Sequence, residues 1–316
     1  MVEPPDLTRV PQGTVPPEEP ARGPSRGTLA RRRLVAIVLI VALVGVGVWA
    51  ATAAIGKGGK ANPPPPPVVA PVIKTYRIIF PEGFTRAQMA ARITAVDAIA
   101  RRKRGFEPAI SAAAYLKATG SSKLPGQFAG DGKRRPLEGF LFPSAYDLYQ
   151  CDSARVLVQK QLAAFKGAWA GVKLRYARSK NLTAYDVLTI ASMVEKEAVV
   201  ESERPLVAAV IYNRLHAHMP LAIDATIRYG LNVPGTKALT ESDLKNPNPY
   251  NTRVHLGLPP TPIANPGLPS IEAAAHPAKV DYLYFVAKPD KRHHFFTASA
   301  DAFNQYLATH GYGPHP

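Results

Sequence analysis

Apolar and polar positions alternate along the chain in patterns that change from segment to segment, and the longest apolar run comes first. Residues 34–55 contain 22 consecutive positions without a charge, which is enough for a helix that crosses a bilayer. Arginines occupy positions 31–33 directly before this run, and fewer cations follow it closely. The positive-inside rule therefore places residues 1–33 in the cytoplasm and the bulk of the chain outside. A cleaved signal peptide that ends at the small residues 51–53 is the alternative interpretation.

The segments on both sides of this run lack the apolar spacing of a folded core. Residues 1–33 are rich in Pro, Gly, Glu and Arg, a composition typical of a disordered tail. Residues 56–73 combine glycine-rich turns with five consecutive prolines, which favour a stiff, extended linker. The pattern therefore predicts a tail, a transmembrane helix at 34–55, and a linker that holds the folded part away from the membrane.

Residues 74–130 predict a small unit that begins with a strand and continues with a helix. The strand is KTYRIIF at 74–80, and Pro81-Glu82-Gly83 forms a turn after it. Thr85 and Gln88 have the spacing of a capping box, which marks the start of the helix.

Residues 131–316 predict a mainly helical domain with a small β hairpin, so the fold class is α+β. One long helix is predicted at 153–179, and the next begins at Thr183, where Asp186 completes a second capping box. The remaining predicted elements are a helix after Pro205, a Pro-, Gly- and Asn-rich stretch at 230–269, a short helix from Ser270, a strand pair around Pro289-Asp290, and a last helix.

Charge and composition narrow the classes of partner. The 316 residues include 39 Lys and Arg and 23 Asp and Glu, a net charge of +16, which favours an anionic partner such as an acidic polymer or lipid headgroups. Cys151 is the only cysteine, so an intramolecular disulfide and a cysteine-based metal site are excluded. The histidine pairs at 216/218 and 293/294 lack the spacing of a helical zinc pair, and no basic helix or aromatic RNA-binding pattern is present. We expect no cofactor and no nucleic-acid partner.

Four glutamates lie in ASMVEKEAVVESERP, residues 191–205, and they are the first candidates for acid–base chemistry. On a helical wheel the apolar stripe has Glu195 near one edge and Glu197 near the other, so the two side chains point about 160° apart. At most one of them can face a given cleft, and periodicity alone leaves the choice open. Glu201 and Glu203 have the pattern of solvated charges.

Six blocks of sequence, in this order, resemble the endolytic murein transglycosylases, which form the YceG-like family. The resemblance covers roughly residues 76–310 and rests on several uncommon strings. The blocks are LEGFLFPSAYDL at 137–148, ASMVEKEA at 191–198, VAAVIYNRL at 207–215, MPLAIDATIRYG at 219–230, NPYNTRVHLGLPPTPIANPG at 248–267, and AAAHPAKVDYLYFVAK at 273–288.

The resemblance implies a bacterial protein with a single span, whose catalytic domain, here residues 131–316, lies outside the cell membrane. It implies a lyase that cleaves the bond between N-acetylmuramic acid and N-acetylglucosamine in nascent peptidoglycan, leaves a 1,6-anhydromuramyl end, and so limits strand length. Glu197, the second glutamate of the E-K-E string, is then the catalytic residue. Peptidoglycan strands and the membrane are the implied partners, and wall synthases are candidate partners.

Two features depart from the family pattern. Family members commonly carry a larger LysM-like region, whereas only about fifty residues separate the proline linker from the catalytic blocks here, so residues 74–130 are expected to be a reduced LysM-like unit. Ala198 and Ser144 stand where relatives often have a hydroxyl residue and an aspartate. Glycan binding and secondary contacts are therefore expected to differ.

One carboxyl group suffices for the implied reaction. A general acid must be protonated near neutral pH, and the apolar neighbours Ile190, Met193 and Val194 could raise the pKa of Glu197. After it protonates the leaving oxygen, the same carboxylate can accept the proton of the sugar's 6-hydroxyl, which attacks the anomeric carbon. No water is added.

Several other residues are candidates for substrate contact, each with a structural alternative. Asp224 could cap the short helix DATIRYG, the favoured role, or contact the sugar directly. Glu138 lies in a glycine and aromatic loop, where a hydrogen bond to backbone is as plausible as substrate contact. Tyr229 could stack on a sugar face or lie partly buried. The remaining candidates form a polar cluster beside proline-rich loops: Tyr250, Asn251 and Thr252.

Two other functions fit parts of the pattern. A muramidase would use water and would need a second, well-placed carboxylate. A catalytically silent scaffold would bind peptidoglycan and recruit wall synthases, although the complete EKEA block favours the enzyme.

Overall fold

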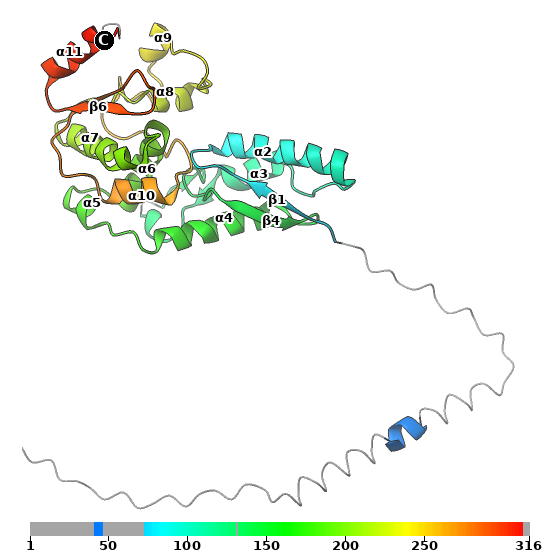
Figure 1. The fold of residues 1–316 in the computed structure, drawn as a ribbon. Coiled ribbons are helices and arrows are strands. Elements are labelled where there is room, and N and C mark those ends of the chain that lie inside the picture. The colour runs from blue at the N-terminus through cyan, green and yellow to red at the C-terminus, as the bar shows by residue number, and fades with distance from the viewer. Residues whose placement is uncertain (1–40, 47–72, 131, 312–316) are drawn as a thin grey trace, which may run out of the picture. The chain divides into compact units, whose positions relative to one another are not determined.

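The computed structural model describes residues 41–46, 73–130 and 132–311, and the chain divides into two units, residues 1–70 and 71–316 (Figure 1). Residues 41–46 are helical. The predicted cytoplasmic tail, and most of the predicted membrane span and linker, lie outside the described residues. Within those three ranges, no helix is both long and apolar enough to cross a membrane.

The second unit opens with a strand, two helices and a returning strand. In chain order these elements are β1 (Thr75–Ile79), α2 (Arg86–Ile99), the π-helical turn η1 (Ala100–Arg104), α3 (Ala112–Gly120) and β4 (Ala145–Tyr149). β1 confirms the predicted strand at 74–80, and the predicted capping box of Thr85 and Gln88 is formed at the start of α2. β4 pairs antiparallel with β1, so this sheet crosses residue 130, where the sequence predicted a boundary.

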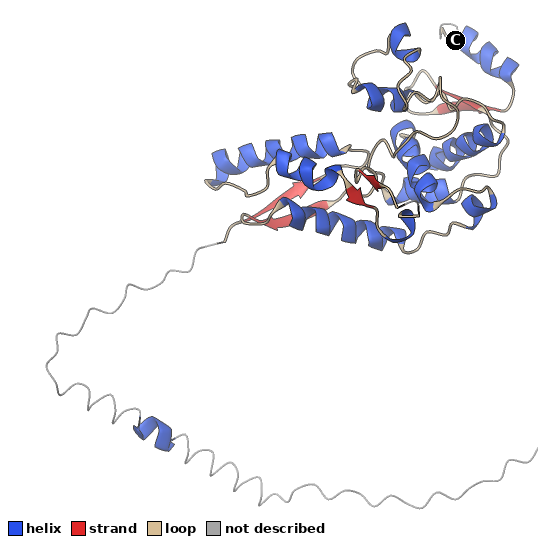
Figure 2. Cartoon of the chain, turned by 180° about the vertical axis from the view of Figure 1, so that it is seen from behind, coloured by secondary structure: helices blue, strands red, loops and turns tan. Residues whose placement is uncertain are grey.

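The rest of the second unit is mainly helical, and Figure 2 shows its strands only as small pairs. The helices are α4 (Ala154–Trp169), α5 (Arg175–Ser179), α6 (Ala184–Glu197), α7 (Arg204–His216), α8 (Asp224–Leu231), α9 (Glu241–Leu244) and α10 (Leu268–Ala275). Shorter elements are β2 (Ser122–Lys123), which pairs with β3 (Arg134–Arg135), and the 3-10 turns η2 (Gly126–Phe128) and η3 (Glu201–Glu203).

The single helix predicted at 153–179 is wrong, because α4 and α5 are separate helices. α4 ends after Trp169, and the chain turns through Gly171, whose low helix propensity favours a break. Leu174 in the connection is buried. Leu174 is the N-cap of α5.

α6 is the central helix, because other helices pack on several of its sides. It begins after Thr183 with the predicted capping box, which Asp186 completes, and α7 and α10 pack against it. Every side chain from Val187 to Val194 is buried, so α6 is covered all round rather than along the single stripe that the sequence indicated. Its last turn, with Glu195 and Glu197, is therefore held in a fixed position.

The second unit ends in a hairpin and a helix, as predicted: β5 (Tyr284–Ala287), β6 (His294–Thr297) and α11 (Ala300–Thr309). Glu203 joins this hairpin to the helical part, since its carboxylate accepts a hydrogen bond from the His294 N–H at 3.1 Å and lies 2.7 Å from the ring Nδ1. The prediction that Glu203 is a solvated charge is wrong, because only 8% of the residue is exposed. The mixture of helices and small sheets confirms the α+β fold class.

Candidate active site

Glu197 is the last residue of α6, and its side chain meets the start of a second helix. Ala198 adopts an extended conformation (φ −89°, ψ 108°) and ends α6. The Glu197 side chain is partly buried, and its carboxylate accepts a hydrogen bond from the backbone N–H of Ala225. Ala225 belongs to the first turn of α8, so the carboxyl group lies at the positive end of that helix dipole.

The surroundings of Glu197 favour its protonated form. The pKa of Glu197 is raised to about 7, chiefly by burial and next by the nearby charge of Asp224. The Ala225 hydrogen bond and the charges of Lys196 and Arg228 oppose this rise in the pKa. A carboxyl group with a pKa near neutrality can both donate and accept a proton at physiological pH, which is what general acid–base catalysis requires.

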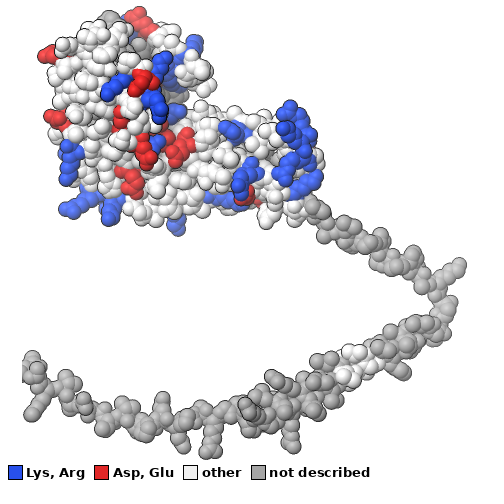
Figure 3. Space-filling model, viewed as in Figure 1, with Lys and Arg blue, Asp and Glu red and all other residues white. Residues whose placement is uncertain are grey.

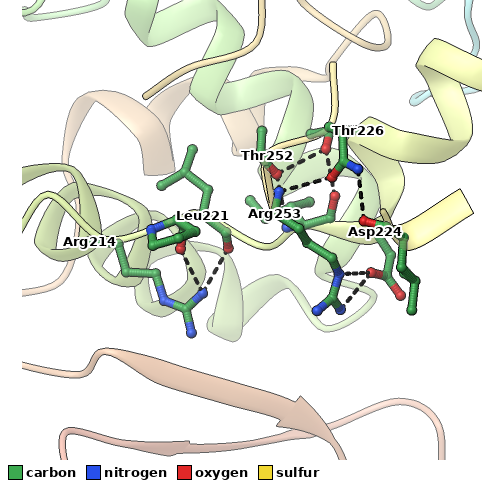
Figure 4. Close-up of polar contacts among 10 residues, drawn as sticks. Arg214, Leu221, Asp224, Thr226, Thr252 and Arg253 are labelled. Atoms are coloured by element: carbon green, nitrogen blue, oxygen red, sulfur yellow. Dashed lines mark hydrogen bonds and ion pairs between the residues drawn. The ribbon is translucent and has the colours of Figure 1, made fainter. Parts of the chain in front are cut away.

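Asp224 lies next to Ala225, and its predicted role as the cap of α8 is wrong. The N-cap of α8 is Ile223, which makes no side-chain capping bond, because the helix already begins at Asp224. Asp224 Oδ1 instead accepts two hydrogen bonds from Arg253, at 3.2 Å from Nε and 2.9 Å from a terminal nitrogen (Figure 4). The Asp224 side chain is 48% exposed and that of Arg253 only 14%, so the aspartate remains accessible to a ligand.

Buried polar side chains hold the loop that carries Arg253. The Thr252 hydroxyl accepts a hydrogen bond from the Ile223 N–H at 3.1 Å and lies 3.0 Å from the Thr226 hydroxyl (Figure 4). The Asn251 side chain donates to two backbone carbonyls and accepts from the Arg253 N–H at 3.0 Å. Thr252 is 1% exposed and Asn251 0%. The structure therefore places these two predicted sugar contacts in the interior, where they position Arg253.

Glu138 is also an interior residue, at 2% exposure. Its carboxylate accepts from the Arg86 N–H at 3.0 and 3.2 Å, from the Asn265 amide at 2.8 Å and from the Tyr229 hydroxyl at 3.1 Å. Burial raises the pKa of Glu138 to about 7, and the hydrogen bonds from these donors oppose the rise. Of the two roles that the sequence left open for Glu138, the observed contacts match the structural one, since they join the start of α2 to α8.

Tyr229 and Tyr250 form an aromatic pair beside this network. Their ring centroids lie 5.0 Å apart at an interplanar angle of 59°, and both residues are partly buried. The Tyr250 hydroxyl lies 2.9 Å from that of Thr261. Sugar contact by the two tyrosines stays a prediction.

Glu195 meets a different set of neighbours from Glu197. Its carboxylate accepts a hydrogen bond from the N–H of Gly267, the N-cap of α10, at 3.1 Å and lies 3.8 Å from the Arg204 guanidinium. Its side chain is 6% exposed. Gly83 packs on it so closely that a Cβ there would lie 3.4 Å from Glu195 Cγ. Glu195 is therefore a packed ion-pair partner rather than a solvated charge.

The arrangement offers acid–base chemistry with a neighbouring anion. In the part of the chain that the structure describes, no group of three or more His, Cys, Asp or Glu residues could hold a metal ion. Sequence reasoning missed Arg253, although it directly follows the polar string at 250–252. Asp224 and Arg253 lie 29 positions apart, so no local periodicity could have paired them.

The sequence pattern of the YceG-like family matches residues 66–309, most of the chain. The chain belongs to the YceG-like family. Among solved structures, that of a YceG-like protein from Listeria monocytogenes is similar with a TM-score of 0.60 and 30% identity, and the match covers 75% of this chain and 76% of that protein.

Two curated proteins named endolytic murein transglycosylase are similar to this YceG-like chain. The one from Bacillus subtilis is 38% identical over 155 residues, which are 49% of this chain and 43% of the relative. The one from Streptococcus pneumoniae is 31% identical over 273 residues, which are 80% of this chain and 47% of the relative. The chain thus spans less than half the length of the curated relatives it matches.

Proposed function

We propose that this YceG-like chain is an endolytic lytic transglycosylase that cleaves the bond between N-acetylmuramic acid and N-acetylglucosamine in nascent peptidoglycan. The observation that carries the proposal is Glu197, whose pKa is raised to about 7 at the junction of α6 and α8. The names of the two curated relatives support it. Cleavage within nascent strands would limit their length, and wall synthases are candidate partners.

Glu197 serves as the acid and then as the base. Its protonated form donates to the glycosidic oxygen as the bond to the anomeric carbon breaks. The resulting carboxylate accepts the proton of the muramyl 6-hydroxyl, whose oxygen forms the new bond to the anomeric carbon. The products are a 1,6-anhydromuramyl end and a free hydroxyl on the leaving sugar, and Glu197 has regained its proton.

Asp224 assists this chemistry through its charge. Its carboxylate raises the pKa of Glu197 and would also stabilise positive charge that develops at the anomeric carbon. Arg253 orients Asp224 through two hydrogen bonds. Arg253 is thus a positioning residue, since it acts on the sugar through Asp224.

A muramidase that uses water is the second candidate, because Asp224 also favours it. A protonated carboxyl group beside an ionised one is the combination that glycoside hydrolases use, with the ionised group as nucleophile or as base for water. Asp224 is ion-paired with Arg253 and half exposed, as that role requires. The two candidates differ in whether oxygen from water enters the product.

We also propose that residues 34–55 anchor the chain in the cell membrane, with residues 1–33 in the cytoplasm and the second unit outside. The uncharged run and the preceding arginines support this orientation. The succession β1, α2, α3, β4 with antiparallel outer strands supports a reduced LysM-like unit. Protease added to intact spheroplasts should digest the second unit and spare the tail, and protection of the second unit would overturn the orientation.

Heavy-oxygen water distinguishes the candidate reactions. The purified full chain, incubated with uncrosslinked glycan, should release fragments that are about one water lighter than hydrolysis products and carry no heavy oxygen. Glu197→Gln keeps the shape of the side chain but cannot deliver a proton, so it should release none. Reducing ends labelled with heavy oxygen would identify a muramidase. Intact glycan that is nevertheless bound would favour the scaffold.

A further inference from the structure

Cations gather at one end of the second unit, where α2 ends and β1 begins. Figure 3 shows Lys and Arg side chains clustered at this end, whereas Asp and Glu side chains are more frequent over the helical half. We call this cluster the basic tip. It consists of Lys74, at the start of the described unit, and the four cations of η1: Arg101, Arg102, Lys103 and Arg104.

Hydrogen bonds hold the basic tip in place, and several of its positive charges are not paired with a carboxylate. Lys74 donates to the backbone carbonyls of Arg104 and Gly105 at 3.4 and 3.2 Å, which fixes η1 beside the start of β1. Arg101 is paired with Asp97 at 3.0 Å and with Glu107 at 2.6 Å. Across the described residues, the other three η1 cations are exposed and have no carboxylate partner.

Large apolar side chains are exposed among these cations. Ile73, which precedes Lys74, is 56% exposed, and Ile99, at the end of α2, is 45% exposed. Tyr149 of β4, opposite Thr75 in the sheet, is 53% exposed. Cations interleaved with exposed aliphatic and tyrosine side chains are typical of surfaces that bind at a membrane interface. A soluble polyanion has no apolar region in which the aliphatic side chains could be buried.

We propose that the basic tip docks onto anionic lipid headgroups of the membrane that anchors the chain. The inference rests on the proposed anchoring by residues 34–55 but not on the proposed reaction. The 18 residues from 56 to 73 span roughly 50 Å when extended. The linker is therefore long enough to let the basic tip reach the headgroups but does not force it there. The affinity of the tip for anionic lipid then determines whether the second unit is held on the bilayer by this end.

Docking would orient the candidate active site. On the face that Figure 3 draws, Asp and Glu side chains are mixed with Lys and Arg over the helical half, whereas cations dominate the tip, so the tip is the part of this face that an anionic surface attracts most strongly. The carboxylates of Glu197 and Asp224 would then face glycan at a defined height above the bilayer.

Cys151 provides a native labelling position beside the tip. It is exposed, and the N–H of its neighbour Gln150 donates to the Lys74 carbonyl at 2.8 Å. The full chain, labelled there with an environment-sensitive dye, is reconstituted in vesicles of phosphatidylcholine alone or mixed with phosphatidylglycerol. The dye should shift to shorter wavelength, and be quenched by lipid-borne nitroxides, only in the anionic vesicles and only at low salt.

Matched charge variants test the assignment to the tip. Each Lys or Arg near an anionic surface contributes about fivefold to binding, so Arg102→Gln, Lys103→Gln and Arg104→Gln together should weaken docking about a hundredfold. The control removes three exposed cations around α5: Lys173→Gln, Arg175→Gln and Arg178→Gln.

Each outcome decides one point. Equal dye spectra in both kinds of vesicle, or equal losses in both triple variants, would overturn the proposal. Tip-dependent binding of polyphosphate in detergent, without a response to anionic vesicles, would assign the tip to a soluble polyanion instead. A chain that fails to float with phosphatidylcholine vesicles would refute the anchoring alone. The readout is independent of whether glycan is cleaved.

Discussion

Asp224 and Lys196 should move the pKa of Glu197 in opposite directions. Burial is the main cause of the raised pKa, the Asp224 charge is the second cause, and the Lys196 charge opposes both. Asp224→Asn removes the anion, and the remaining amide oxygen can still accept a hydrogen bond from Arg253. Lys196→Gln removes the cation from an exposed side chain. Neither change alters the burial of Glu197, so each isolates a charge effect.

The size of the effect follows from the fraction of Glu197 that is protonated. A charge a few ångströms away shifts a pKa by about 1 to 3 units, and we expect about one unit from Asp224, because it is half exposed and paired with Arg253. With a pKa of about 7, roughly half of Glu197 is protonated at pH 7. With a pKa of about 6, roughly one tenth remains protonated, a loss of about fivefold in rate.

The assay is the pH dependence of kcat/KM for glycan cleavage. The acid must be protonated, so the rate falls as pH rises through the pKa of Glu197, with a midpoint near pH 7 in the unmodified chain. Asp224→Asn should move this descending limb about one unit toward acid, and Lys196→Gln should move it by less toward base. The rate on the acidic plateau separately reports any direct contact of Asp224 with the sugar.

Shifts of the same sign in both variants, or an unmoved limb in Asp224→Asn, would refute the reasoning. If the unmodified chain showed no descending limb near pH 7, Glu197 would not be the acid. Unfolding curves at the two ends of the pH range provide the control, because a variant that unfolds above pH 7 would imitate a descending limb.

Four substitutions test the packing around the site. Glu195→Gln should lower the free energy of unfolding by about 1–3 kcal/mol, because it leaves a buried ion-pair partner unpaired. Above pH 7, Glu197→Gln should unfold at the same urea concentration as the unmodified chain or at a higher one, because it removes a partly buried charge. Glu138→Gln should also lower the free energy of unfolding by about 1–3 kcal/mol, since the new amide nitrogen would face donors rather than acceptors. An unchanged midpoint of urea unfolding would contradict the role of the Glu138 hydrogen bonds. Gly139→Ala should lower the melting temperature, since Gly139 has φ +89° and a Cβ would lie 2.8 Å from Pro262; an unchanged melting temperature would show that the loop can shift.

Features coded by neighbouring residues were predictable from the sequence. The capping boxes at Thr85 and Thr183 and the hairpin formed by β5 and β6 all depend on residues only a few positions apart. A side chain at a helix start finds its backbone partner within one turn. The strand composition of residues 74–80 was likewise sufficient to identify β1, but not its partner β4, which lies some 70 residues later.

Features that depend on distant partners were not predictable. The residues around Glu203 in the sequence resemble those around a solvated glutamate. Glu203 is nevertheless buried, because its carboxylate contacts His294, which lies 91 positions later. Asn251 and Thr252 lie in a polar string of the kind found in functional loops. In the structure, their side chains instead form hydrogen bonds with backbone groups. Polar side chains mark a loop that needs internal hydrogen bonds as readily as one that binds a ligand, because both tasks use the same donors and acceptors.

The two glutamates of the E-K-E string show what distinguishes a structural carboxylate from a candidate acid. Each meets a backbone N–H at the start of another helix, Gly267 before α10 for Glu195 and Ala225 in α8 for Glu197. The difference lies in the next neighbour, which is the Arg204 cation for Glu195 and the Asp224 anion for Glu197. A cation stabilises the ionised form, and an anion stabilises the protonated form. The helical period turns the two side chains toward different neighbours, and only the anion beside Glu197 is seen to favour a protonated carboxyl group.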